Sequence, residues 1–131
     1  MFEQAKREIL IADHILTTTM RMLNDKNLVF SALNHLEKAL RHIMMEKLRE
    51  AKKPIPREIT VLKEMYKEIG EKELFPIIER VYELVNIKRK ESMNFLRNGN
   101  IIVLTKDYRS YIITQREVKE LIEGVKAFLK V

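Results

Sequence analysis

A polar cluster in the first predicted helix holds the side chains best suited to catalysis. Asp13 and His14 stand among apolar residues, and Arg7 lies seven positions before the histidine. Thr17 and Thr18 follow one turn later, so each shares a helix face with one of the first two. These groups suit an enzyme site if they line a cleft. The commoner use, hydrogen bonding to the next helix or to backbone carbonyls, is the one that the sequence favours.

A second set of residues fits an anionic ligand. Residues 87–131 hold ten basic and five acidic side chains, with tyrosines interleaved among the arginines. Basic groups neutralise phosphates while a tyrosine stacks on a base, which predicts a nucleic-acid-binding face. The alternative is a solvated basic surface with core tyrosines, and consecutive helical cations cannot form one tight patch. The candidate residues are Lys88, Arg89, Arg97, Tyr108, Arg109 and Arg116.

Other kinds of site lack the residues that they need. The chain has no cysteine, which excludes disulfides, thiolate nucleophiles and cysteine-based zinc sites. His35 and His42 are seven residues apart on one predicted helix, and a separation of about 10 Å is too great for one metal ion. Glycine-rich phosphate loops and hydrolase motifs are absent from the sequence. We therefore expect neither a metal nor a cofactor.

The spacing of apolar residues predicts how these side chains are positioned. Helical periodicity covers residues 2–23, 28–51, 57–69 and 74–96, with a polar turn at 24–27. Two β-branched runs, 101–105 and 110–114, predict a β-hairpin. Thr114 and Glu117 then form a capping-box pattern that opens a last helix. We expect a mainly α protein over residues 1–131: one domain, an antiparallel up-and-down bundle of about five helices with a β-hairpin before the last.

Composition and charge limit the setting of the protein. Its 131 residues suffice for one hydrophobic core. With only three glycines and three prolines, the chain has few residues that break helices. No stretch approaches the roughly 18 apolar residues of a membrane span, and the first residues do not resemble a signal peptide. We expect a cytoplasmic protein without a membrane partner. The 34% of charged residues, with only two glutamines, is a composition typical of thermophiles.

The second predicted helix resembles the HEPN superfamily. Residues 32–40 read Ala-Leu-Asn-His-Leu-Glu-Lys-Ala-Leu, which is similar to the A-x-x-x-x-E-K-A-L pattern of that family. The resemblance implies a four- or five-helix bundle that forms a homodimer. It also implies action on RNA or nucleotides, or pairing with a small nucleotidyltransferase in a toxin–antitoxin system. HEPN nucleases carry, late in the bundle, an arginine and a histidine separated by four to six intervening residues, whereas this sequence has no histidine after His42.

Three hypotheses follow. The first is a non-catalytic, HEPN-like, homodimeric module that binds RNA or nucleotides through its C-terminal basic face. The second is a self-association or protein-interaction bundle without a nucleic-acid ligand. The third is a ribonuclease-type enzyme using Arg7, Asp13 and His14, whose Arg–His spacing falls in the first helix rather than late in the bundle.

Overall fold

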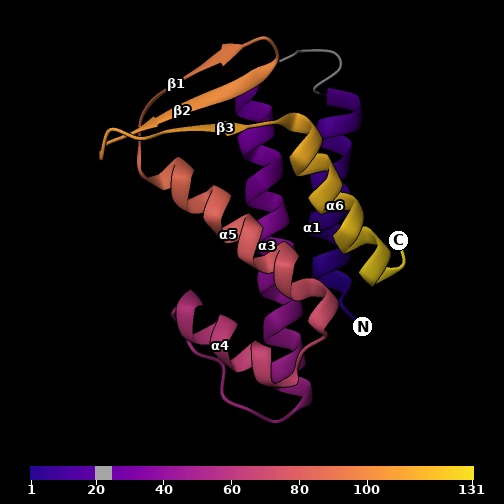
Figure 1. Ribbon diagram of the computed structural model, residues 1–131. Helices are drawn as coiled ribbons and strands as arrows, with labels where there is room; N and C mark the ends of the chain where they lie inside the picture. Colours follow the sequence, from indigo (N-terminus) through magenta and orange to yellow (C-terminus); the bar gives the residue numbers. More distant parts are fainter. Residues whose placement is uncertain (20–24) are drawn as a thin grey trace.

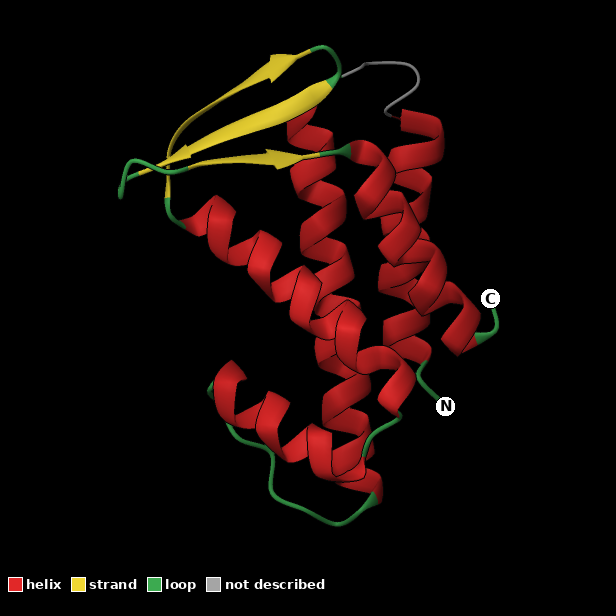
Figure 2. Ribbon diagram, viewed as in Figure 1, coloured by secondary structure: helices red, strands yellow, loops and turns green. Residues whose placement is uncertain are grey.

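The computed structural model describes residues 1–19 and 25–131. Within them the chain is mainly helical, as predicted, with five α-helices and a three-stranded antiparallel sheet before the last helix (Figures 1 and 2). The helical elements are α1 (Glu3–His14), the π-helical η1 (Ile15–Thr19), α3 (Lys26–Glu50), α4 (Ile59–Ile69), the 3-10 segment η2 (Lys72–Leu74), α5 (Phe75–Arg89) and α6 (Gln115–Leu129). The strands are β1 (Glu91–Arg97), β2 (Asn100–Thr105) and β3 (Ser110–Ile113).

The longest helix, α3, contacts each of the other four α-helices. Its predicted apolar stripe is buried, with Leu36, Leu40 and Ile43 fully inaccessible to water. As predicted, α1 packs against α3 in the antiparallel direction. The Phe2 N–H donates to the Glu46 carboxylate at 3.0 Å near the end of α3. The two chain ends also meet, since the rings of Phe2 and Phe128 lie 5.9 Å apart, on the side away from the sheet (Figure 1).

The boundaries of the first two helices differ from the prediction. The helix expected over 2–23 is α-helical to His14 and continues as η1, while residues 20–23 lie outside the described part of the chain. The predicted turn at 24–27 is wrong for Lys26 and Asn27, which are already helical, and residue 24 is not described. The Asp25 carboxylate accepts the Asn27 N–H at 2.9 Å, so a side-chain cap starts α3 early.

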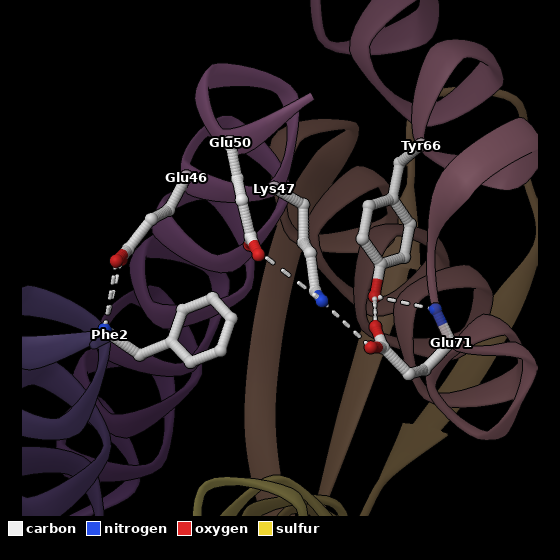
Figure 3. Close-up of polar contacts among 6 residues, drawn as sticks. All are labelled: Phe2, Glu46, Lys47, Glu50, Tyr66 and Glu71. Carbon is white, nitrogen blue, oxygen red and sulfur yellow. Dashed lines mark hydrogen bonds and ion pairs between the residues drawn. The ribbon is translucent and has the colours of Figure 1, made fainter. Parts of the chain in front are cut away.

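Helix α4 is fastened to the end of α3 by a small polar group (Figure 3). The hydroxyl of buried Tyr66 donates to the Glu71 carboxylate and accepts the Glu71 N–H, both at 3.3 Å, while Lys47 pairs with that carboxylate at 2.9 Å. Gly70 ends α4 with an extended backbone (φ −88°) rather than the left-handed conformation in which glycine often ends a helix. A Cβ there would lie 2.2 Å from Tyr66 Cζ, so a glycine is needed for close approach.

The helix predicted over 74–96 is wrong beyond Arg89. Pro76 lies in the first turn, where a helix tolerates proline, but the chain leaves the helix at Lys90 and residues 91–97 form β1. Met93 and Phe95 matched a helical spacing, yet both are exposed on a strand. Asn98 and Gly99, expected to end a helix, instead form a two-residue hairpin turn with φ of 53° and 79°. These positive angles are those of a type I′ turn, which Asn-Gly favours.

The predicted hairpin therefore forms part of a three-stranded sheet in the order β1-β2-β3. Ile101, Val103 and Ile113 face the helices and are buried. The alternate positions form what we call the outer face. It has one row of Phe95, Ile102 and Ile112 and a second row of Met93, Leu104 and Ser110, as the register places them side by side. The helices cover only one face of this sheet (Figure 2).

The last helix begins as predicted, because the Thr114 hydroxyl accepts the Glu117 N–H at 3.0 Å. The Glu117 carboxylate instead accepts two hydrogen bonds from Arg80 of α5, at 2.8 and 3.0 Å. No helix in the described part of the chain combines the length and apolar character needed to cross a bilayer.

Candidate nucleic-acid interface

The loop between β2 and β3 presents Tyr108 to solvent. Its side chain is 100% exposed and its φ is 63°. The left-handed conformation costs a residue with a Cβ about 1–2 kcal/mol, and glycine is the usual residue there. Strained residues of this kind concentrate at functional sites. An exposed aromatic ring in a costly backbone conformation is therefore the strongest single indication of a binding site on the sheet.

The buried Thr105 holds this loop in place. Its N–H donates to the Arg109 carbonyl at 2.9 Å, and its carbonyl accepts the Tyr108 N–H at 3.1 Å. The Thr105 hydroxyl lies within hydrogen-bond reach of the same Arg109 carbonyl and of the Asp107 carboxylate. The loop is thus pre-ordered by backbone and side-chain bonds, so little conformational entropy is lost when it binds a ligand.

A hollow of about 450 Å³ lies beside the tyrosine at the end of the outer face. Met93 and Leu104 contribute apolar side chains to its lining, which also includes Tyr108 and Arg109. Its full lining is Ser92, Met93, Leu104, Thr105, Lys106, Tyr108 and Arg109. An apolar lining with an aromatic ring and cations beside it suits a flat ring that carries an anionic group.

The charges around this hollow are mainly positive. Lys106 lies two residues before Tyr108 and Arg109 directly after it. The Lys106 N–H donates to the Lys90 carbonyl at 3.1 Å, and the charge of Lys90 acts on Asp107 in the same loop. Asp107 is the acidic residue of the loop and pairs with Arg109 at 3.7 Å. The hydrogen bond from the Thr105 hydroxyl, together with the nearby cations, lowers the pKa of Asp107. The loop region keeps a positive excess, because three cations face one carboxylate.

The structure separates the predicted basic residues. Tyr108 and Arg109 lie at the hollow, whereas Arg97 lies at the opposite end of the outer face, beside the Asn-Gly turn. The six residues of β2 between these ends span about 20 Å. Arg116 is 90% exposed in the first turn of α6 and contacts Glu120 at 3.2 Å.

Lys88 and Arg89 belong to other surroundings. Lys88 contacts Glu91 at 2.5 Å and lies 4.8 Å from the ring centre of Phe30, so its charge is used between α5, β1 and α3. Arg89 donates to Asn86 on the exposed side of α5. These two consecutive residues point apart, as their helical position requires, and neither lines the hollow.

The cluster in the first helix does not converge on one point. Arg7 and His14 are both exposed and lie about 10 Å apart along α1. The Asp13 carboxylate contacts Lys126 of α6 at 3.0 Å. The Thr17 hydroxyl donates to the Asp13 carbonyl at 2.8 Å, the backbone bond that the sequence favoured. Asp13 thus links two helices, and this geometry gives no support to the catalytic hypothesis.

The remaining histidines lie among the helices. His35 Nδ1 is 2.6 Å from the Glu8 carboxylate, an ordinary contact between α3 and α1. His42, on the same helix, is half-buried. Within residues 1–19 and 25–131, no group of three potential metal ligands comes together.

A second cleft, of about 370 Å³, lies between α3, α4 and α5 and was not anticipated. The Tyr82 hydroxyl donates to Glu37 at 2.7 Å, and Arg41 binds the same carboxylate twice at 3.0 Å. Burial raises the pKa of Tyr82, and the adjacent Glu37 raises it further, so the phenol stays protonated. Lys63 lies 5.2 Å from the Tyr82 ring centre and pairs with Glu79. Because these charged groups neutralise one another, we interpret them as contacts that join α3, α4 and α5 rather than as a ligand site.

Sequence reasoning missed Lys106, Met93 and Phe95 as members of the interface. Lys106 lies between the two predicted strands, and Met93 and Phe95 fall within the helix expected over 74–96. The Asn98-Gly99 pair was the available signal, because it predicts a hairpin and would have turned residues 91–97 into a strand. No family model, curated protein or solved structure matches the chain.

Proposed function

We propose that the protein is a non-catalytic, HEPN-like binding module, an up-and-down helical bundle that acts as a homodimer and binds RNA or nucleotides through the outer face of its sheet. The observation that carries this proposal is the fully exposed, left-handed Tyr108 between Lys106 and Arg109. The helical body positions the sheet, and the sheet carries the ligand site.

The chemistry of the site supports this ligand class. A tyrosine ring stacks on any nucleobase, and such stacking is sequence-tolerant. Cations beside the ring neutralise phosphates and release counterions, so affinity falls as salt rises. The Arg97 guanidinium at the far end of the outer face adds a second point of charge attraction for a chain-like anion.

A binding assay with charge controls tests the proposal. The probe is a fluorescein-labelled mixed-sequence 12-nucleotide RNA, and anisotropy is measured at low and at physiological salt. Replacing Arg97, Lys106 and Arg109 by alanine should weaken binding at least tenfold and reduce its salt dependence. The matched control replaces Arg49, Lys53 and Arg57, which are exposed and lie at the end of the molecule away from the sheet. Equal losses in the two triple variants, or no RNA binding by the native chain, would refute the proposal.

The second candidate is a self-association or protein-interaction module, with a nucleotidyltransferase-type protein among the partners that the resemblance implies. The row of Phe95, Ile102 and Ile112 favours it, because its two outer members, Phe95 and Ile112, are exposed and exposed apolar residues often mark protein interfaces. Ile112→Lys tests whether this row is a protein interface, in which case it should abolish association measured by light scattering. RNA binding by the native chain then separates the two candidates, because only the first predicts it.

A further inference from the structure

We infer that the outer face takes a single-stranded nucleic acid with splayed bases, and that it discriminates against a duplex. This inference rests on the proposed function and adds the class of ligand. It depends on where the apolar and the charged side chains lie on the sheet.

The cations lie at the two ends of the outer face. Lys106 and Arg109 lie at one end and Arg97 at the other, across the length of β2. Between them the side chains are apolar or small: Met93, Phe95, Ile102, Leu104, Ser110 and Ile112. A duplex laid on this surface would press phosphates and riboses against hydrocarbon, which desolvates them without a hydrogen-bonding partner. Nucleobases released from a stack lose little water there, because their faces are apolar.

The aromatic residues fit the same ligand. Phe95 is 37% exposed in the row nearest Arg97, and Tyr108 is fully exposed at the other end. In a duplex every base is already stacked on its neighbours, so its face is closed to these rings. The aliphatic floor between the rings offers no hydrogen bonds to base edges, so we expect binding with little sequence preference.

The edge of β1 is partly closed to an extended peptide that would add a strand to the sheet. The Lys26 ammonium donates to the Asn94 carbonyl at 3.0 Å. A lysine on a strand edge opposes the addition of a further strand, and here it occupies a carbonyl that an added peptide would need. The face of the sheet is therefore more accessible than the β1 edge.

The length of the face sets the size of the ligand. About 20 Å between the charged ends accommodates a short segment, near the lower limit of the roughly 4 to 16 nucleotides that single-strand sites cover. A strand that places phosphates near Arg97 and Arg109 would set its intervening bases over Phe95, Met93 and Tyr108.

The test compares ligands of equal charge. Labelled 20-nucleotide single strands of RNA and of DNA, and an RNA hairpin of the same length with a stem of eight base pairs, are titrated with the full chain. We expect at least tenfold tighter binding of a single strand than of the hairpin. Equal affinity for the hairpin would overturn this inference while leaving the proposed function intact, whereas failure to bind any of the three would overturn both.

Tyr108→Gly identifies the stacking residue without the risk of a misfolded loop. Glycine adopts the φ of 63° without strain, so the variant should be at least as stable as the native chain. It should lose about tenfold in single-strand affinity, within the range for one stacked base. Tyr108→Phe keeps the ring and should retain binding. Unchanged affinity in Tyr108→Gly would refute the assignment of Tyr108.

Discussion

The helical body and the sheet differ in how far they bury their apolar side chains. In α3 ten residues are buried, because neighbouring helices surround the stripe. In the sheet, Ile113 is fully buried while its neighbour Ile112 is 57% exposed, because helices cover one face only. The helices thus shelter most of their apolar surface within the chain, and the sheet leaves an uncovered row. This difference locates the surface available for a ligand.

The largest expected effect concerns the centre of the helical body. Leu40→Ala in α3 removes a fully buried side chain and leaves a cavity, so it should lower the free energy of unfolding by about 2–5 kcal/mol. Urea denaturation measures it. Leu10→Ala on the exposed side of α1 is the control and should change stability by less than about 0.5 kcal/mol. Similar values for the two variants would contradict a core centred on α3.

A smaller loss is expected where α4 meets α3. Gly70→Ala places a Cβ 2.2 Å from the Tyr66 ring and should destabilise the protein by about 1–3 kcal/mol. Gly124→Ala in α6 is a matched control, since its Cβ would meet the flexible end of Ile77 at 2.7 Å and a helix gains from alanine. Thermal unfolding should lower the midpoint of the first variant more. A tolerated Gly70→Ala would show that the Tyr66 contact is loose.

Acid should weaken the same contact slightly. Burial alone would raise the pKa of Glu71, but hydrogen bonds from Lys47 and Tyr66 outweigh it and lower the pKa. A carboxyl with a depressed folded pKa stabilises the fold above its unfolded pKa of about 4.3, and this is lost as pH falls through the folded value. Glu71→Gln should flatten the loss of stability between about pH 5 and 3, by less than about 1 kcal/mol because Glu71 is partly exposed. Glu73→Gln is the control, and an equal flattening there would contradict the assignment.

The smallest expected effect is on the outer face. Ile112→Thr keeps a β-branched strand residue and removes only exposed hydrocarbon, so stability should change by less than about 0.5 kcal/mol. Ile113→Thr, on the inner face, buries a hydroxyl and should cost several times more. Chemical denaturation of the pair checks this. A large loss in Ile112→Thr would mean that the outer face is already covered, for instance in a homodimer.

The sequence was sufficient where local pattern decides the outcome. The apolar stripe of α3, the Pro76 start of α5 and the Thr114 cap follow from spacing and local hydrogen bonding. The prediction was wrong for residues 91–97 because Met93 and Phe95 also match a helical period. Only pairing with β2 decides between helix and strand there. The Asn98-Gly99 turn was the local signal that went unused.

The contacts between distant elements were beyond any local pattern. The pairing of Arg80 with Glu117 and of Asp13 with Lys126 depends on how helices pack. The same holds for the candidate interface. Tyr108 and Arg109 were proposed from composition, but their position beside Met93 and Leu104 requires the register of three strands. Sequence reasoning named some of the right residue types and could not say which of the basic ones share a surface.

The meeting of the two chain ends has a practical consequence. Because Phe2 and Phe128 touch on the side away from the sheet, a tag or surface anchor at either end leaves the outer face open to solvent (Figure 1). A few glycines and serines would also suffice to join the ends. The circularised chain could then be reopened between α3 and α4, giving a permuted protein whose sheet is unaltered and whose attachment point is new.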